Sequence, residues 1–254
     1  MNKSLLIAEI ATSDEVGKLG LMHLKRYWSK LYLSTNKRCM IPEEPGLDNA
    51  LLSAAGIGIY QVSKYFYEKR PSFAQFEDWV LALNDGQLDK ERTNRFNSLF
   101  SGSADMKRNG PHLYTLSSED LRFWDENGYL IVRNAVPKED CKAAVDAICE
   151  FLQIDLEDEN TWYLAHKSLQ GIMVQLFQHP VLQRNRGSEK VKAVYEQLWN
   201  RSDLWVNTDK VGFNPPENDH YKFRGTGLHW DVSLEQPIPF GTQGILYLTD
   251  TSSD

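Results

Sequence analysis

The sequence predicts an α+β fold in which helices come first and strands follow. From about Thr12 to Phe100, apolar residues recur at three- and four-residue steps, which is the spacing of amphipathic helices. Helical spacing continues, with one short apolar run between helices, from Ser117 to Trp199. After Leu204 the pattern changes to short apolar segments, some with the period-two alternation that is typical of strands.

A linker divides the chain into two regions. The triplets Ser-Gly-Ser at 101–103 and Asn-Gly-Pro at 109–111 bracket a segment rich in residues that favour turns. We therefore expect a helical region of unknown role over residues 1–104 and a mixed domain over residues 105–254.

The helical region contains three predicted helices. The first is capped by Ser13 and runs to about Leu31. The second covers residues 48–67. The third opens with a capping box made by Ser72 and Gln75. Its predicted buried stripe consists of Phe73, Phe76, Val80 and Leu83.

The mixed region opens with a helix over residues 117–127 that Gly128 ends, because glycine accepts the left-handed conformation needed there. A short strand is predicted at residues 129–132. Pro137 then precedes a helix that runs through Leu152, since proline is tolerated in a first helical turn.

Two further helices are predicted over residues 166–177 and 188–199, and strands follow from Leu204. In the run GLHWDVSL, residues 227–234, apolar and polar side chains alternate as they do in a half-buried strand. A turn-rich break separates this run from a more apolar predicted strand at residues 243–249.

A histidine and a carboxylate one residue apart form the candidate metal site. His229 and Asp231 project from the same face of the predicted strand, because strand side chains alternate. An imidazole and a carboxylate are two of the three protein ligands that hold Fe(II) in non-haem oxygenases, where open positions remain for a cosubstrate and dioxygen. The third ligand is a second histidine, and none follows Asp231 in this sequence.

Three blocks, in this order, resemble the phytanoyl-CoA dioxygenase family: residues 118–152, 203–218 and 227–251. The resemblance covers roughly residues 115–254. That family consists of Fe(II)- and 2-oxoglutarate-dependent oxygenases, so the resemblance implies flanking helices followed by a partial double-stranded β-helix, or jelly roll.

The resemblance also implies roles for individual residues. His229 and Asp231 are expected to bind Fe(II), and Thr226 is placed where some relatives present a hydroxyl to 2-oxoglutarate. Asn214 is a second candidate for the cofactor pocket, although a β-forming threonine and a solvated strand face explain Thr226 and Asn214 equally well. Because Asp231 stands where halogenating relatives lack the carboxylate, oxidation of a C–H bond in a small or carrier-tethered metabolite is favoured over halogenation.

The family's distal histidine and its 2-oxoglutarate-binding arginine have no counterpart here. Truncation of a longer protein is the favoured explanation, because residues 250–254 have the composition of a turn. A second polypeptide that completes the fold, or a fragment reused as a structural module, remain open. An unpaired last strand would favour self-association through its edge. Of the earlier histidines, His220 is the nearest alternative ligand, and His23 is interpreted as a packed core residue.

Composition restricts the other functions. A net charge of −7 argues against a nucleic-acid partner, which would need a basic surface. The sequence has no apolar run of membrane-spanning length and no secretory signal at its start, and an odd count of 3 cysteines suits reduced thiols in the cytoplasm. Two alternatives to the oxygenase are a non-catalytic helical interaction protein that retains a jelly-roll remnant, and a cupin-like enzyme with other metal ligands.

Overall fold

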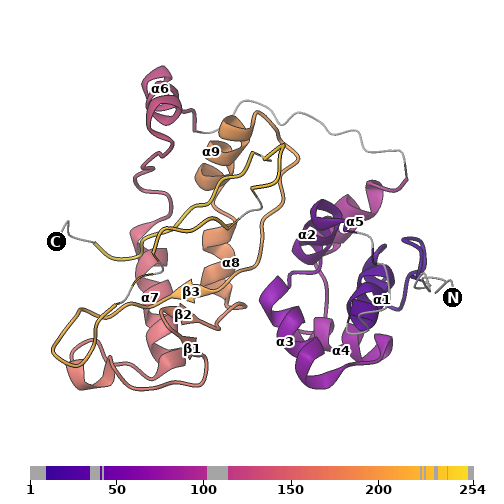
Figure 1. Cartoon of the computed structure of the whole chain (residues 1–254), viewed down its shortest axis with the longest axis horizontal. Coiled ribbons are helices and arrows are strands. Elements are labelled where there is room, and N and C mark those ends of the chain that lie inside the picture. Colours follow the sequence, from indigo (N-terminus) through magenta and orange to yellow (C-terminus); the bar gives the residue numbers. More distant parts are fainter. Residues whose placement is uncertain are drawn as a thin grey trace, which may run out of the picture. The chain divides into compact units, whose positions relative to one another are not determined.

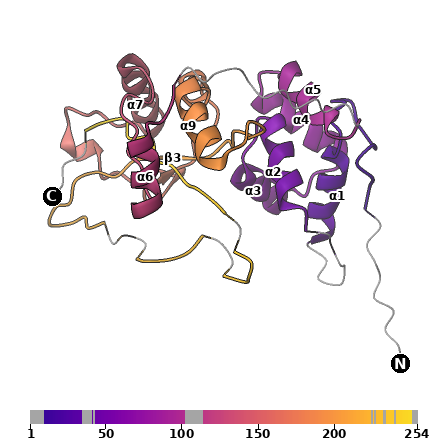
Figure 2. The same cartoon turned by 90° about the horizontal axis from the view of Figure 1, so that it is seen from above.

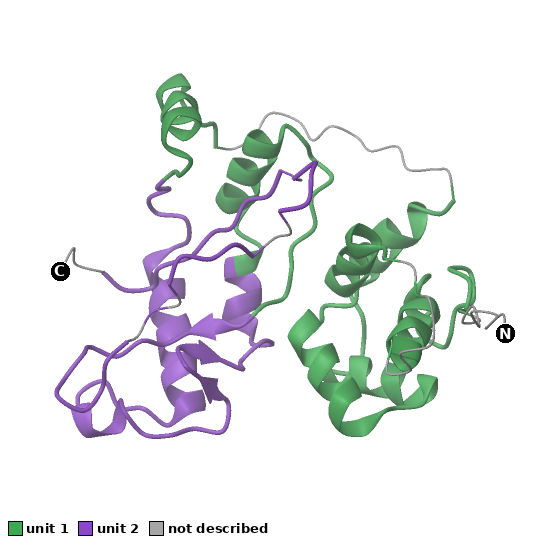
Figure 3. Cartoon of the chain, in the orientation of Figure 1, with its two compact units in different colours: residues 1–130, 186–209 green, residues 131–185, 210–254 purple. Residues whose placement is uncertain are grey.

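The structure is a computed structural model that describes residues 10–34, 41, 43–101, 114–223, 225, 227–231, 234–238 and 240–250. It divides into two compact units, which Figure 3 colours separately. Unit 1 comprises Met1–Leu130 and Arg186–Asp209, and unit 2 comprises Ile131–Asn185 and Lys210–Asp254. The predicted boundary at residue 104 lies outside the described residues and stays a prediction.

The first helices of unit 1 form a bundle, which Figures 1 and 2 show from two directions. They are α1 (Leu24–Ser34), α2 (Pro45–Ala54), α3 (Ile59–Lys69), α4 (Phe73–Leu83) and α5 (Lys90–Ser98). Their apolar faces meet in one core, because burying these stripes removes apolar surface from water. Its fully buried side chains include Leu21, Leu24, Leu51, Val62, Phe76, Val80 and Phe96.

The capping box predicted for the third helix is confirmed at the start of α4. The Ser72 hydroxyl accepts a hydrogen bond from the Gln75 amide, and the Gln75 side chain accepts one from the Ser72 amide at 2.9 Å. Phe76 and Val80 are fully buried, as their spacing predicted.

Two helix predictions in the bundle are wrong in their bounds. The first helix begins at Leu24 rather than after Ser13, because His23 has a left-handed backbone (φ +65°) that no helix continues. The predicted helix over residues 48–67 is divided into α2 and α3 at Gly56 (φ +64°). A side chain at Gly56 would also meet Asn84, whose amide nitrogen holds two backbone carbonyls.

Three later helices agree with the sequence. α6 (Ser118–Asn127) is capped by Ser117 and ends at Gly128, where φ is +74°. α7 (Lys138–Leu152) follows Pro137, and α9 (Glu189–Trp199) is capped by Ser188. The sequence did not predict α8 (Pro180–Arg186) or the short 3-10 turn η1 (Glu159–Thr161).

The sheet of unit 2 is small and antiparallel. Its strands are β1 (Leu169–Gln170), β2 (Met173–Val174) and β3 (Val211–Gly212), in the order β1-β2-β3. Val174 lies opposite Val211 in the register and is fully buried. It packs with residues of α7 and α8 in a second core, which contains Ala144, Ile148, Leu152, Val181 and Leu182.

Several strand and helix predictions for the mixed region are wrong. Residues 166–177 form the β1-β2 hairpin instead of a helix, with a turn at Gly171 (φ +59°). No strand is present at residues 129–132, 227–231 or 243–249, and only Val211–Gly212 is a strand among residues 204–214.

The reason is pairing. A strand takes its hydrogen bonds from a neighbour, and the apolar side chains of Leu228 and Trp230 are exposed instead of covered. The described fold is therefore mixed helical with a small antiparallel sheet, and it does not show a jelly roll.

Two smaller observations concern the membrane and the thiols. In the parts of the chain that the structure describes, no helix combines the length and the apolar character needed to cross a membrane. Cys141 and Cys149 lie on α7 as free cysteines, and Cys39 falls outside the described residues.

The bundle core generates a stability prediction. Phe76→Ala leaves a cavity at a fully buried site and should lower the free energy of unfolding by about 3–5 kcal/mol. The matched control is Tyr67→Ala, since Tyr67 is 88% exposed, and it should change that free energy by no more than about 0.5 kcal/mol. Urea unfolding followed by far-ultraviolet circular dichroism measures both, and equal losses in the two variants would contradict this core.

Candidate functional site

The structure brings His229 and Asp231 together, although not on a strand. The His229 Nε2 atom lies 3.4 Å from Asp231 Oδ1. Both side chains are about half exposed, at 51% and 55%, so a small ligand can reach the pair from solvent. The two residues lie in an irregular segment that begins after Gly227, whose φ of +65° turns the chain just before His229.

Each side chain of the pair is held from its far side. His229 Nδ1 lies 3.0 Å from the carbonyl oxygen of Gly227, which can only accept a hydrogen bond, so Nδ1 carries the proton. Asp231 Oδ2 accepts a hydrogen bond of 2.7 Å from Gln243 Nε2. These contacts leave His229 Nε2 and Asp231 Oδ1 facing one another.

This arrangement fits a cation between the two atoms. With the proton on Nδ1, a neutral imidazole directs the Nε2 lone pair at a carboxylate oxygen, and two acceptors repel unless positive charge lies between them. Two ligand atoms about 2.1 Å from one ion are roughly 3.0–3.4 Å apart at ordinary coordination angles, which matches the observed separation. Second hydrogen bonds of this kind orient the ligands of metal sites.

The other predicted site residues are placed less directly. Thr226 lies outside the described residues. The exposed Asn214 follows β3, and its side-chain oxygen accepts a hydrogen bond of 3.0 Å from the Tyr221 hydroxyl. A role for Asn214 in binding 2-oxoglutarate therefore stays a prediction.

A third ligand is not found beside the pair. Within the described ranges, no further histidine, cysteine or carboxylate forms a group of three with His229 and Asp231. The exposed His220 belongs instead to a turn in which its amide and that of Tyr221 donate to Asn218 Oδ1.

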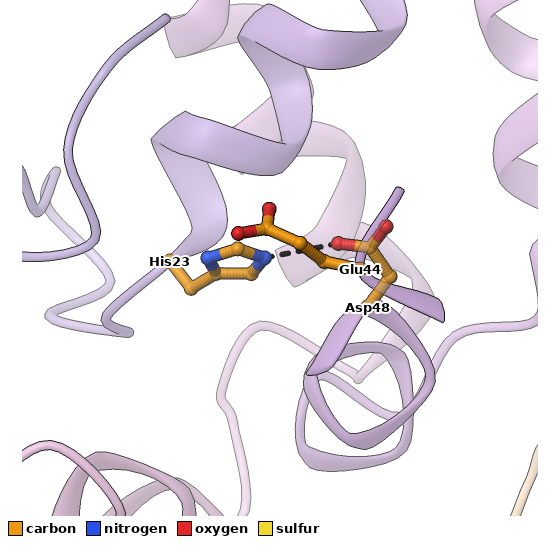
Figure 4. Close-up of side chains that lie close together, drawn as sticks. All are labelled: His23, Glu44 and Asp48. Carbon is orange, nitrogen blue, oxygen red and sulfur yellow. Dashed lines mark hydrogen bonds and ion pairs between the residues drawn. The ribbon is translucent and has the colours of Figure 1, made fainter. Parts of the chain in front are cut away.

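A second group of potential ligands lies in the bundle. His23, Glu44 and Asp48 place one ligand atom each within 4.8 Å of the others, and Figure 4 shows both carboxyl groups beside the imidazole. His23 is fully buried, as its interpretation as a core histidine predicted. Its Nδ1 lies 3.2 Å from the Ser13 hydroxyl, and its Nε2 lies 2.9 Å from Asp48 Oδ1.

Two cations from α1 already neutralise these carboxylates. The buried Lys30 ammonium donates to both oxygens of Asp48, at 2.9 and 2.7 Å, and to Glu44 at 3.1 Å. Arg26 donates to both oxygens of Glu44 at 3.1 and 2.9 Å. The hydrogen bond from Arg26, together with Lys30, lowers the pKa of Glu44 to about 2.

The three donors are thus close enough to hold a metal ion, but their surroundings favour an ion-pair network. Two carboxylates face two cations, so a divalent ion would add uncompensated positive charge beside the buried Lys30. Donation from His23 Nε2 to Asp48 also uses the nitrogen that a metal would need. The sequence carried one signal of this network, the four-residue spacing of Arg26 and Lys30 and of Glu44 and Asp48.

Comparison with known proteins gives one distant similarity. Part of the chain is 26% identical over 125 residues to a protein of Dictyostelium discoideum named "Putative phytanoyl-CoA dioxygenase". The match covers 44% of this chain and 36% of that protein, so the chain spans about a third of the relative's length. It supports a relationship to a dioxygenase at a coarse level.

The other two comparisons add nothing to this. No family model matches the chain. No solved structure matches it.

The ion-pair network generates a prediction about pH. Because the pKa of Glu44 falls from 4.5 to about 2 on folding, its ionised form stabilises the fold above pH 4.5, and that contribution is lost as the pH falls toward 2. Glu44→Gln should therefore destabilise the protein at neutral pH and lose this difference from wild type in acid. Urea unfolding across the pH range measures the difference, with Glu43→Gln at the exposed neighbour as the control. A difference that does not change with pH would contradict the ion pairing.

Proposed function

We propose that this chain supplies His229 and Asp231 as two ligands of an Fe(II)- and 2-oxoglutarate-dependent oxygenase. Its substrate would be a small or carrier-bound metabolite that is oxidised at a C–H bond. The observation that carries the proposal is the 3.4 Å approach of His229 Nε2 to Asp231 Oδ1, two acceptors that face one another with no lysine or arginine between them in the described structure. The distant similarity to a dioxygenase supports the same chemistry.

The residues around the pair would prepare it for iron. The Gly227 carbonyl fixes the His229 tautomer so that Nε2 is free to coordinate. Gln243 engages Oδ2 of Asp231, which leaves Oδ1 for the metal and favours a single bond from this carboxylate. A bound ferrous ion would supply dioxygen activation with 2-oxoglutarate as cosubstrate, and one imidazole with one monodentate carboxylate leaves positions for both.

The exposed apolar residues around the pair suit the family's jelly roll. Leu228 and Trp230 alternate with the two ligands, and Ile245 and Tyr247 follow the same period further on. We propose that these segments become strands once neighbouring strands cover their apolar faces. In the family that the sequence resembles, a later strand carries the third ligand and the arginine, so the protein for the test is produced from its whole reading frame.

Iron binding tests the function directly. Anaerobic Fe(II) added to protein with 2-oxoglutarate should produce a visible metal-to-ligand charge-transfer band, because the cosubstrate coordinates the metal. His229→Ala and Asp231→Ala should each remove the band, since each deletes a ligand. His220→Ala and Asp219→Ala are matched controls, because both residues are exposed and lie within twelve residues of the ligands. A wild type without the band, or ligand variants that retain it, would overturn the proposal.

The outer contact of Asp231 can be tested separately. Gln243→Leu removes the amide that orients the carboxylate and should weaken Fe(II) binding by about 10–100-fold, the usual effect of losing such a contact. Gln87→Leu, at an exposed glutamine of unit 1, is the control for the change of residue type. Unchanged affinity in Gln243→Leu would show that the amide does not support the metal ligand.

A further inference from the structure

A short segment after α9 returns to the helical bundle within unit 1. This segment, residues 204–208, is called the strap below. Trp205 of the strap packs against the bundle core, and its ring meets the edge of Phe96 at 6.1 Å between centroids. The guanidinium carbon of Arg95 lies 4.1 Å from the centre of the same ring, in cation–π contact. Trp205 is therefore held on two sides by α5.

Polar contacts hold the backbone of the strap as well. Arg95 Nη2 donates to the Leu204 carbonyl at 2.9 Å. The hydroxyl of Ser53, a buried residue of α2, donates to the side-chain oxygen of Asn207 at 3.1 Å. Thr208 is buried, so the strap lies in the surface of the bundle rather than over it.

The residues next to the strap are fixed as well. On one side, Arg201 forms an ion pair with Asp203, and this contact lowers the pKa of Asp203. On the other, Arg186 Nη2 donates to the Asp209 carbonyl at 2.6 Å. A segment held by anchored neighbours loses most of its freedom to move.

We propose that the bundle is a positioning domain whose α2–α5 surface takes the strap of its own chain as a partner. Two residues separate Thr208 from β3, and β3 leads into the segment that carries the two ligands. Anchoring the strap thus fixes where the chain enters the sheet. The proposal extends the function above, and it gives the helical region a role other than binding a separate protein at this surface.

Hydrogen exchange tests the anchor in metal-free protein. Trp205→Ala should raise amide exchange about tenfold or more across residues 204–212, and more weakly across 227–231, while α1 and α3 stay protected. Trp205→Phe should restore most of the protection, because a second aromatic ring retains the contacts with Phe96 and Arg95. Tyr67→Ala, an exposed aromatic position of the same bundle, is the control and should change none of these rates.

A second variant covers the case in which Trp205→Ala does not fold. Arg95→Gln removes the cation–π contact and the bond to Leu204 from an exposed position, and it should raise exchange in the same peptides. Unchanged exchange in the strap would overturn the anchor, and a freed strap with unchanged exchange at 211–212 and 227–231 would overturn positioning. Because these readouts need no iron, they are independent of whether the wild type shows the charge-transfer band.

Discussion

The contact between Lys30 and the carboxylates of Glu44 and Asp48 is the constraint on which the helical bundle depends. A buried ammonium is costly unless its charge is matched and its protons are bonded, and here three carboxylate oxygens accept from it. The match requires α1 and α2 to meet in one register, with Arg26 on Glu44. The arrangement of α2 in turn places Ser53 where the strap reaches it.

The same electrostatic reasoning separates the two clusters of potential metal ligands. The bundle cluster has more donors, but its charge is already balanced and its histidine is fully buried and engaged on both nitrogens. The pair His229 and Asp231 has fewer donors, yet its two free acceptors face one another and are open to solvent. A site that lacks positive charge and is accessible suits a cation better than a neutral, closed one, so the smaller cluster is the better candidate for iron.

Local chemistry decided which parts of the fold could be predicted. The capping box of Ser72 and Gln75 and the left-handed end at Gly128 depend on residues a few positions apart, and both were predicted. The hairpin at Gly171 was not, because its apolar spacing also suits a helix. The strand expected around Leu228 failed because pairing depends on a neighbour that no local pattern specifies. The convergence of His229 on Asp231 needed only a turn at Gly227, whereas Gln243 and Lys30 act across distances in sequence that spacing does not reveal.

These differences explain why the helical region bears on the candidate site at all. The ligand segment has no strand of its own among its described residues, so its geometry depends on contacts from elsewhere. Gln243 is one such contact, and the path by which the chain enters β3 is another. That path begins at the strap, which Trp205 and Asn207 fix to helices more than a hundred residues earlier in the sequence. A segment with little structure of its own can present two ligands reproducibly only if its ends are held, and the bundle holds the chain from which one of those ends arises.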